Sequence, residues 1–324
     1  MAGNRIMEST QELIFLKPDL KERIWGGTRL RTEWGYTSDL PGKLGECWAV
    51  SCNTRTDCEI LNGMYQGRHL SELWKECPEL FGGQTDGDFP LLVKIIDAGE
   101  NLSVQVHPDD AYARGHGYAC GKWECWYILE CPEHAELIVG NNAGSRWELE
   151  QAVREGAWDQ LLNRVPIRKG DFLRVEPGTL HAITAGVELL EVQQNSDITY
   201  RIYDYERLQN GKRRELHLKE GLEVTRVPCR VTQDDVIHTD TRENVPQLLA
   251  DTQQYRMWTI AVNGRTAPGI TSDRFLAGSV LEGSGRINGT EVRKGMHFIA
   301  PCGYGMEKLE GRMRLHLTEP AIKM

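Results

Sequence analysis

Four polar residues that lie far apart in the sequence form the set best suited to chemistry: Gln105, His107, Glu124 and His181. Together they offer two imidazoles, one carboxylate and one amide oxygen, a mixture that suits zinc or another divalent first-row metal. A single histidine is more often a hydrogen-bonded structural residue than a ligand. The combination of all four favours a metal site, and we expect one ion per chain.

These four residues need strands and a turn to bring them together. If residues 102–110 run extended, Ser103, Gln105 and His107 share one face, because side chains two apart point the same way. Glu124 lies in a second expected strand, residues 122–130, and His181 follows a Pro-Gly turn. A glycine turn that bends the chain so that a histidine enters the site resembles the cupin pattern of small jelly-roll barrels.

A second polar stretch, residues 188–204, adds a candidate cavity wall. If it is extended, one face carries Glu191, Gln193, Asn195, Asp197, Thr199 and Arg201. We interpret this face as the wall of a polar cavity, and a solvated outer face is the alternative. Lys94, in an apolar strand, could approach an anion together with Ser103, and Lys122 lies two residues before Glu124. A metal beside lysine and arginine indicates a phosphorylated or carboxylated, oxygen-rich ligand.

Composition excludes several other functions. The chain has 324 residues, 38 basic and 47 acidic, and a net charge of −9. Because no Lys/Arg-rich block stands out, we expect neither nucleic acid nor an anionic membrane as a partner. Residues 1–20 lack a signal-peptide core, and no run of about 18 apolar residues occurs. Nine cysteines without tight spacing indicate reduced thiols. We therefore predict a soluble cytoplasmic protein.

The order of expected elements indicates a mainly β fold with a few short helices. Helices are expected at residues 71–77, from Asp109 to Gly115 or Gly117, and at residues 147–162. Strands are expected within residues 13–60, at 89–98, 122–130 and 135–140, and again from Ile167. Glycines then recur every eight residues, a rhythm typical of a β sandwich or barrel.

The last third of the chain contains a repeat. Arg-Lys-Gly ends at Gly170, eight residues before Gly178, and the same triplet ends at Gly295, eight residues before Gly303. We infer two related jelly-roll β-barrel units, with a boundary near residues 239–247. Residues 1–240 would form the metal-binding unit, and residues 241–324 a second unit without metal ligands. Continuing the alignment places Met306 where His181 lies and Leu276 where Glu124 lies. Chance similarity is the alternative for matches this short.

The chain resembles the type I mannose-6-phosphate isomerases (phosphomannose isomerases) of the cupin superfamily, in their short bacterial, Bacillus-like form. The resemblance covers roughly residues 10–220, and Trp123 departs from it, because a smaller residue or proline is expected there. Five motifs in the same order carry the resemblance: Phe89-Pro90-Leu91-Leu92-Val93-Lys94, Ser103-Val104-Gln105-Val106-His107-Pro108-Asp109, Gly121-Lys122-Trp123-Glu124-Cys125-Trp126-Tyr127, Pro177-Gly178-Thr179-Leu180-His181-Ala182, and the run from Glu191 to Arg201.

The resemblance implies a zinc enzyme that interconverts mannose 6-phosphate and fructose 6-phosphate through an enediolate. It implies that Gln105, His107, Glu124 and His181 bind the zinc, that Arg201 acts in the active site, that Lys122, Glu191 and Asp197 line the pocket, and that Ser103 and Lys94 lie near the phosphate. The general base is left open between Glu191 and Lys122. The alternatives are an iron-dependent cupin dioxygenase and a non-catalytic sugar-phosphate-binding cupin. We expect a monomer or a weak homodimer.

Overall fold

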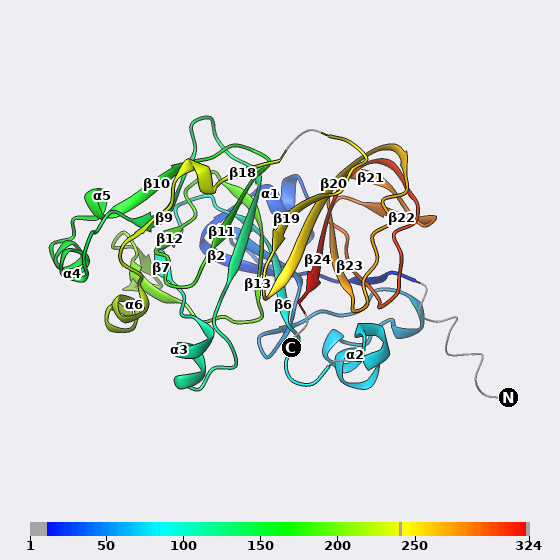
Figure 1. The fold of residues 1–324 in the computed structure, drawn as a ribbon, viewed down its shortest axis with the longest axis horizontal. Coiled ribbons are helices and arrows are strands. Elements are labelled where there is room, and N and C mark those ends of the chain that lie inside the picture. The colour runs from blue at the N-terminus through cyan, green and yellow to red at the C-terminus, as the bar shows by residue number, and fades with distance from the viewer. Residues whose placement is uncertain (1–11, 84, 240–241, 322–324) are drawn as a thin grey trace.

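The fold is built from antiparallel β-sheets with short helices at the edges (Figure 1). The computed structural model describes residues 12–83, 85–239 and 242–321. Within these ranges the expected mainly β class is confirmed, and all nine cysteines carry free thiols. Most of residues 1–20, on which the expectation about a signal peptide rests, and residues 240–241 at the predicted unit boundary lie outside the described residues.

The first sheet carries Glu124, Lys94 and Glu191. Its register places Lys94 opposite Glu191, and it places Gln193 opposite Glu124. Residues directly opposite each other on antiparallel strands have neighbouring side chains. In spatial order its strands are β18 (Ile237–His238), β11 (Asp171–Val175), β8 (Glu124–Glu130), β13 (Glu188–Gln194), β6 (Leu91–Asp97), β3 (Leu44–Val50) and β2 (Asp19–Gly27).

The second sheet carries three other candidate residues in one row. His181 pairs with Gln105, and Gln105 pairs with Arg201 on its other side. The three side chains therefore emerge side by side from adjacent strands. The strands are β10 (Leu162–Pro166), β9 (Glu136–Asn141), β12 (His181–Ala182), β7 (Val104–Val106) and β14 (Tyr200–Tyr203), with β17 (Cys229–Arg230) pairing to β9.

An apolar core joins these two sheets face to face. Trp126 and Leu189 of the first sheet pack with Leu137 and Val139 of the second. Helices cover the opposite face of the second sheet, where Leu149 packs in a cluster with strand residues. These helices are α3 (Asp110–Gly115), α4 (Arg146–Glu155), α5 (Trp158–Leu161) and α6 (Leu218–Val224), and all lie toward one end of the molecule (Figure 1).

The C-terminal sheet forms the other end of the molecule and has a core of its own. Phe298, Leu315 and Leu317 are fully buried there. The sheet includes one strand from the start of the chain, since Ile14 pairs with Ile299. The strand that contains Ile14 lies outside residues 241–324, the range predicted for the second unit. The division of the chain at residue 240 stays a prediction. The strands are β1 (Ile14–Leu16), β23 (His297–Ala300), β21 (Leu276–Ile287), β24 (Leu309–Pro320), β20 (Tyr255–Thr266) and β19 (Gln247–Asp251), with β22 (Thr290–Arg293) pairing to β21.

The first sheet is buried on both faces, because its second face packs on the C-terminal sheet. Val93 and Tyr127 share a cluster with Met257 and Ala277. Tyr255 reaches across and donates a hydrogen bond to the carbonyl of Val192 over 3.1 Å.

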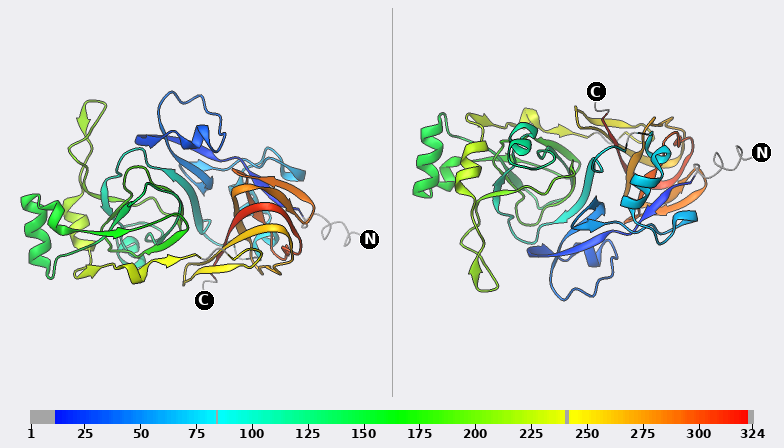
Figure 2. Two further views of the ribbon diagram at one scale, coloured as in Figure 1. Left: turned by 90° about the horizontal axis from the view of Figure 1, so that it is seen from above. Right: turned by 90° about the horizontal axis from the view of Figure 1, so that it is seen from below.

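The remaining elements lie at the rims: α1 (Arg29–Thr32), α2 (Leu70–Glu76), the 3-10 turns at Gly63–Tyr65, Pro78–Phe81 and Gln233–Asp235, and the two-residue strands β4 (Cys52–Asn53), β5 (Thr56–Asp57), β15 (Leu208–Gln209) and β16 (Lys212–Arg213). The β15–β16 hairpin projects from the body of the protein (Figure 2).

Two expected elements are interrupted. The single helix expected over residues 147–162 ends at Gly156, which adopts a left-handed φ of 68° and caps α4. Glycine adopts this conformation without the steric cost that other residues meet. The polar strand expected over residues 188–204 is split into β13 and β14, so its six polar side chains do not share one strand face. Asn195 turns away to donate to the carbonyl of Cys52 over 2.9 Å.

The turns of the proposed repeat have matching conformations. Gly170 and Gly295 both have φ of 86°, and Gly178 and Gly303 have φ of 81° and 77°. Met306, at the position aligned with His181, is fully buried in the C-terminal core. No helix of the described ranges has the length and apolar character that a membrane span needs.

Candidate metal centre and active-site cavity

Three of the four proposed ligands form one buried cluster. The candidate ligand atoms of His107, Glu124 and His181 all lie within 4.8 Å of one another. Nε2 of His107 lies 3.4 Å from Oε1 of Glu124, and Nε2 of His181 lies 3.5 Å from Oε2. None of the three residues is more than 1% exposed.

Both imidazoles are held in the form that binds metals. Nδ1 of His107 donates to the carbonyl of Ile198 over 2.6 Å, and Nδ1 of His181 donates to the carbonyl of Thr179 over 2.9 Å. A carbonyl can only accept, so the proton lies on Nδ1 and Nε2 carries the lone pair. Nε2 of His181 lies beside Glu124, and Nε2 of His107 lies beside both Glu124 and Nζ of Lys122, which is 3.2 Å away. Burial lowers the pKa of His181, and burial together with Lys122 lowers the pKa of His107 to about 3. Both rings are therefore neutral at physiological pH.

Glu124 is ionised in spite of its burial. Burial by itself would raise its pKa, but the Lys122 ammonium holds the pKa well below its usual range. Lys122 forms an ion pair with Oε1. Both carboxylate oxygens are buried, and neither accepts a regular hydrogen bond from the described ranges of the chain. A buried anion with free acceptor positions between two neutral imidazoles fits a divalent cation.

Gln105 completes the set at the edge of the cluster. Its Nε2 lies 3.3 Å from Nε2 of His181. Since the two ends of a side-chain amide have nearly the same shape, a half-turn of the amide would bring the oxygen to this position. Gln105 can therefore supply the oxygen that the sequence predicted. The structure brings all four predicted ligands together, and their role as metal ligands stays a prediction.

A polar cavity of about 810 Å³ opens directly beside this centre. Gln105 and Lys122, which contact the buried cluster, lie in its wall. The wall also contains the remaining residues that the sequence predicted to be catalytic or to bind substrate, namely Lys94, Ser103, Glu191, Asp197 and Arg201. Ser103 directly precedes β7 and lines the same cavity as Gln105. The structure thus gathers every predicted site residue in one place, although it does not assign their roles.

Lys94 and Glu191 form a buried ion pair in the cavity wall. Nζ of Lys94 also donates to Oε1 of Gln193 over 2.8 Å, and Nε1 of Trp126 donates to the second oxygen of Glu191 over 3.0 Å. Burial would lower the pKa of Lys94, but Glu191 and other nearby carboxylates raise it above its ordinary value. Lys94 is charged and fixed, and Glu191 is held by partners on both oxygens.

Arg201 and Asp197 occupy more open positions. Nη1 of Arg201 donates to the carbonyl of Glu215 over 2.9 Å, while its Nε is buried and has no partner among the residues that the structure describes. Burial and the nearby guanidinium of Arg214 lower the pKa of Arg201. Asp197 is 42% exposed at the side chain and pairs with Arg55 over 2.6 Å.

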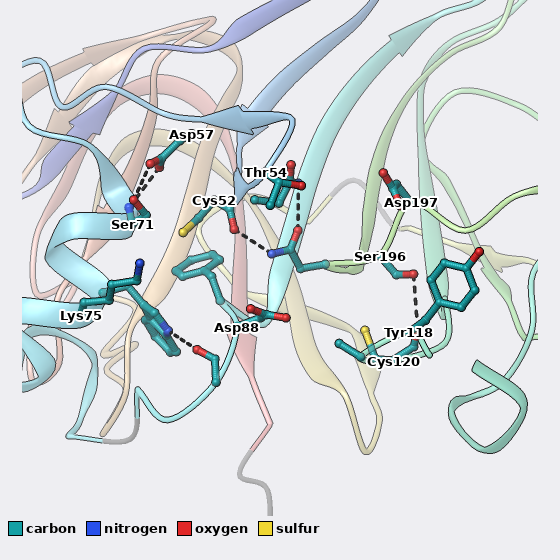
Figure 3. Close-up of a pocket in the computed structure, with 16 residues that line it drawn as sticks. Cys52, Thr54, Asp57, Ser71, Lys75, Asp88, Tyr118, Cys120, Ser196 and Asp197 are labelled. Atoms are coloured by element: carbon teal, nitrogen blue, oxygen red, sulfur yellow. Dashed lines mark hydrogen bonds between the residues drawn. The ribbon is translucent and has the colours of Figure 1, made fainter. Parts of the chain in front are cut away.

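A second pocket of about 410 Å³ borders the first and shares Tyr118 and Asp197 with it. Figure 3 shows these two residues on one side of this pocket, opposite Asp57, Ser71 and Lys75. Asp197 therefore belongs to the rim between two hollows.

Arg214 and His217 are among the cavity residues that sequence reasoning missed. No sequence neighbour of His217 suggests a site. One local signal was present, since Asn210-Gly211 predicts a tight hairpin turn. Both residues have positive φ, 54° and 76°, and the hairpin returns the chain to Arg201.

The buried His-Glu-His centre beside a polar cavity, in an antiparallel β fold, defines a cupin-like protein with a candidate metal site. Comparisons with known proteins narrow this class. Residues 13–120 match the family model of the type I phosphomannose isomerase catalytic domain. The chain belongs to the type I phosphomannose isomerase family, as its motifs indicated.

Its relatives are similar over nearly their whole length. Mannose-6-phosphate isomerase ManA of Bacillus subtilis is 46% identical over 310 residues, which are 93% of this chain and 97% of that protein. Mannose-6-phosphate isomerase of Streptococcus mutans is 41% identical over 303 residues, 90% of this chain and 92% of that protein. The crystal structure of mannose 6-phosphate isomerase from Bacillus subtilis superposes with a TM-score of 0.84 at 39% identity, covering 95% of this chain and all of that one.

Proposed function

We propose that this protein is a zinc-dependent isomerase that interconverts D-mannose 6-phosphate and D-fructose 6-phosphate by proton transfer through an enediolate. The observation that carries the proposal is the buried cluster of His107, Glu124 and His181 directly behind the cavity wall. The names of the curated relatives and the crystal structure supply the substrate.

His107, Glu124, His181 and Gln105 would hold one zinc ion. The donor types suit zinc, and the two neutral imidazoles and the ionised carboxylate need no further proton loss to bind it. When bound, the ion supplies Lewis-acid polarisation of sugar oxygens.

The reaction moves a proton from C2 to C1 of the open-chain sugar, while a second proton passes between O1 and O2. Arg201 is our candidate for stabilising the negative oxygens of the enediolate, because its buried Nε has no partner in the described part of the chain. Such preorganised donors stabilise charge that develops during a reaction.

Glu191 is our candidate base, because the contacts from Lys94 and Trp126 fix its orientation in the cavity wall. Lys122 is the alternative base, and it forms an ion pair with Glu124. Asp197 would line the pocket, and Ser103 and Lys94 would lie near the phosphate.

The proposal includes a cytoplasmic location, which the nine free thiols support, and a chain that acts as a monomer or a weak homodimer. Phosphorylated hexose is the only ligand class that it requires besides the metal.

The test is a coupled assay of fructose 6-phosphate formed from mannose 6-phosphate, before chelation, after chelation, and after zinc is added back. We expect activity to disappear on chelation and to return with zinc. Absence of turnover in the zinc-loaded protein would refute the proposal. The assay is repeated without oxygen, because activity with zinc under anaerobic conditions excludes an iron dioxygenase. Binding of mannose 6-phosphate without turnover would identify a sugar-phosphate-binding protein instead.

A further inference from the structure

His217 lies where the chain returns from the β15–β16 hairpin and enters α6, and it lines the same cavity as Arg201. Two hydrogen bonds join the two residues, one between their main chains and one from the Arg201 main chain to the His217 ring. The amide of His217 donates to the carbonyl of Arg201 over 2.7 Å, and the amide of Arg201 donates to Nδ1 of His217 over 3.1 Å. With the bond from Nη1 of Arg201 to the Glu215 carbonyl, the segment 215–217 holds Arg201 at three points.

These contacts decide which nitrogen of the His217 ring can donate. Because Nδ1 accepts a hydrogen bond from a main-chain amide, the proton of the neutral ring lies on Nε2. Among the described residues, Nε2 has no hydrogen-bond partner, and the ring is only partly buried. His217 therefore offers an N–H donor at the cavity wall.

The neighbourhood of this donor suits an oxygen-rich anion. The guanidinium groups of Arg201 and Arg214 line the cavity with it, and Arg214 is oriented by Asp204 through a 2.7 Å bond to Oδ2. Glu215, also in the wall, directs its main-chain carbonyl at Arg201. Neutral and charged N–H donors side by side recognise sugar hydroxyls and phosphate oxygens.

We propose that His217 is a binding and positioning residue of the proposed isomerase. Nε2–H donates to an oxygen of the bound sugar phosphate, and Nδ1 fixes the main chain that presents Arg201. One ring thus couples the position of the substrate to that of the candidate enediolate-stabilising group. The inference rests on the proposed function for its substrate class.

Two substitutions separate the two nitrogens. Asparagine has its amide at about the position of Nδ1, so His217→Asn retains an acceptor for the Arg201 amide and removes the outer donor. Glutamine has its amide at about the position of Nε2, so His217→Gln retains the outer donor and removes the acceptor. We expect His217→Asn to raise KM about tenfold with kcat changed less than about threefold. We expect His217→Gln to lower kcat about tenfold with KM changed less than about threefold.

A matched control is His134→Asn, since the His134 side chain is 90% exposed and has a φ of 60° that asparagine tolerates. This variant should leave both constants unchanged. Zinc content and the unfolding temperature of all variants show whether a kinetic change comes from a damaged fold. If both His217 variants match the wild type, or if both lose zinc and stability together, His217 is structural and the inference is overturned.

Binding of fructose 6-phosphate, measured by calorimetry, separates this inference from the proposed function. Wild-type protein that binds the sugar phosphate but does not turn it over would refute the function alone. In that case about tenfold weaker binding by His217→Asn supports the inference, and equal binding overturns it. Wild-type protein that binds no fructose 6-phosphate overturns both.

Discussion

Nζ of Lys94 lies 2.9 Å from Oε1 of Glu191, and both side chains are almost fully buried between strands β6 and β13. A buried ion pair contributes little net stability, but removing one partner leaves the other charge without compensation. The pair therefore fixes the cavity wall, and its two members must be changed together to test this role.

We predict that Lys94→Met lowers the free energy of unfolding by about 3 kcal/mol, and that adding Glu191→Gln restores much of it. Urea unfolding of the single and double variants measures this coupling. The control is Lys17→Met, because the Lys17–Glu59 pair is 61% and 39% exposed and should contribute less than about 1 kcal/mol. A Lys94→Met variant as stable as the control would contradict the prediction.

Arg201→Ala should abolish most turnover and leave the metal in place. The hydrogen bonds of its side chain and amide go to Glu215 and His217, not to the proposed ligands. We expect kcat to fall by about 100-fold or more, as for the loss of a donor to a developing oxyanion. Turnover and zinc content are measured on the same sample. Arg286→Ala, an exposed change in the C-terminal sheet, is the control, and turnover that survives Arg201→Ala shows that the assigned role is wrong.

Glu124→Gln should remove the metal. The variant keeps the shape of the side chain but loses the charge that lies between two neutral imidazoles. We expect zinc affinity to fall more than about 100-fold in a chelator competition. Zinc should also raise the unfolding temperature of the wild type but not of the variant, because a ligand stabilises the state that binds it.

Glu130→Gln is the matched control for this change, since Glu130 ends the same strand and pairs with exposed Lys169. It should retain normal zinc binding. If Glu124→Gln binds zinc as tightly as this control does, Glu124 is not a ligand.

Glu188 should make stability fall as the pH rises. Burial raises its pKa from 4.5 to about 7. The 2.7 Å hydrogen bond that Nε1 of Trp34 donates to Glu188 lowers the pKa, but its effect is smaller than that of burial. The folded state therefore holds a proton that the unfolded state releases near its ordinary pKa. The stability gained from this proton is complete below the ordinary pKa and is lost as the pH rises through about 7.

Glu188→Gln removes this titration and keeps a carbonyl for Trp34. As the pH rises from about 5 to about 8, the wild type should lose on the order of 2 kcal/mol of unfolding free energy that the variant does not lose. Urea unfolding at the two pH values measures the gain, with Glu133→Gln as an exposed control. An equal pH dependence in the wild type and Glu188→Gln would exclude Glu188 as its source.

The site was easier to predict than the strands that carry it. Ligand types are visible in sequence, and the alternation of Ser103, Gln105 and His107 follows from strand geometry alone. The fixed histidine tautomers depend on the carbonyls of Ile198 and Thr179, and only the folded chain shows that Ile198 lies beside His107.

The missed features depend on contacts across the fold. His217 becomes a cavity residue because a hairpin returns the chain to Arg201, not because of its neighbours in sequence. The polar run after Glu188 is broken where Asn195 bonds to the distant Cys52 carbonyl, a tertiary contact that strand periodicity cannot reveal. The apolar character of β1 gave no sign that its partner lies near the other end of the chain.

The pairing of β1 with β23 has a consequence for biosynthesis. Ile299, opposite Ile14 in the sheet, is synthesised 285 residues after it. Domains generally fold as units while the chain is being made, N-terminal parts first. Here β1 cannot pair with β23 until the intervening residues have been made, so this apolar strand stays unpaired in the nascent chain over that whole interval.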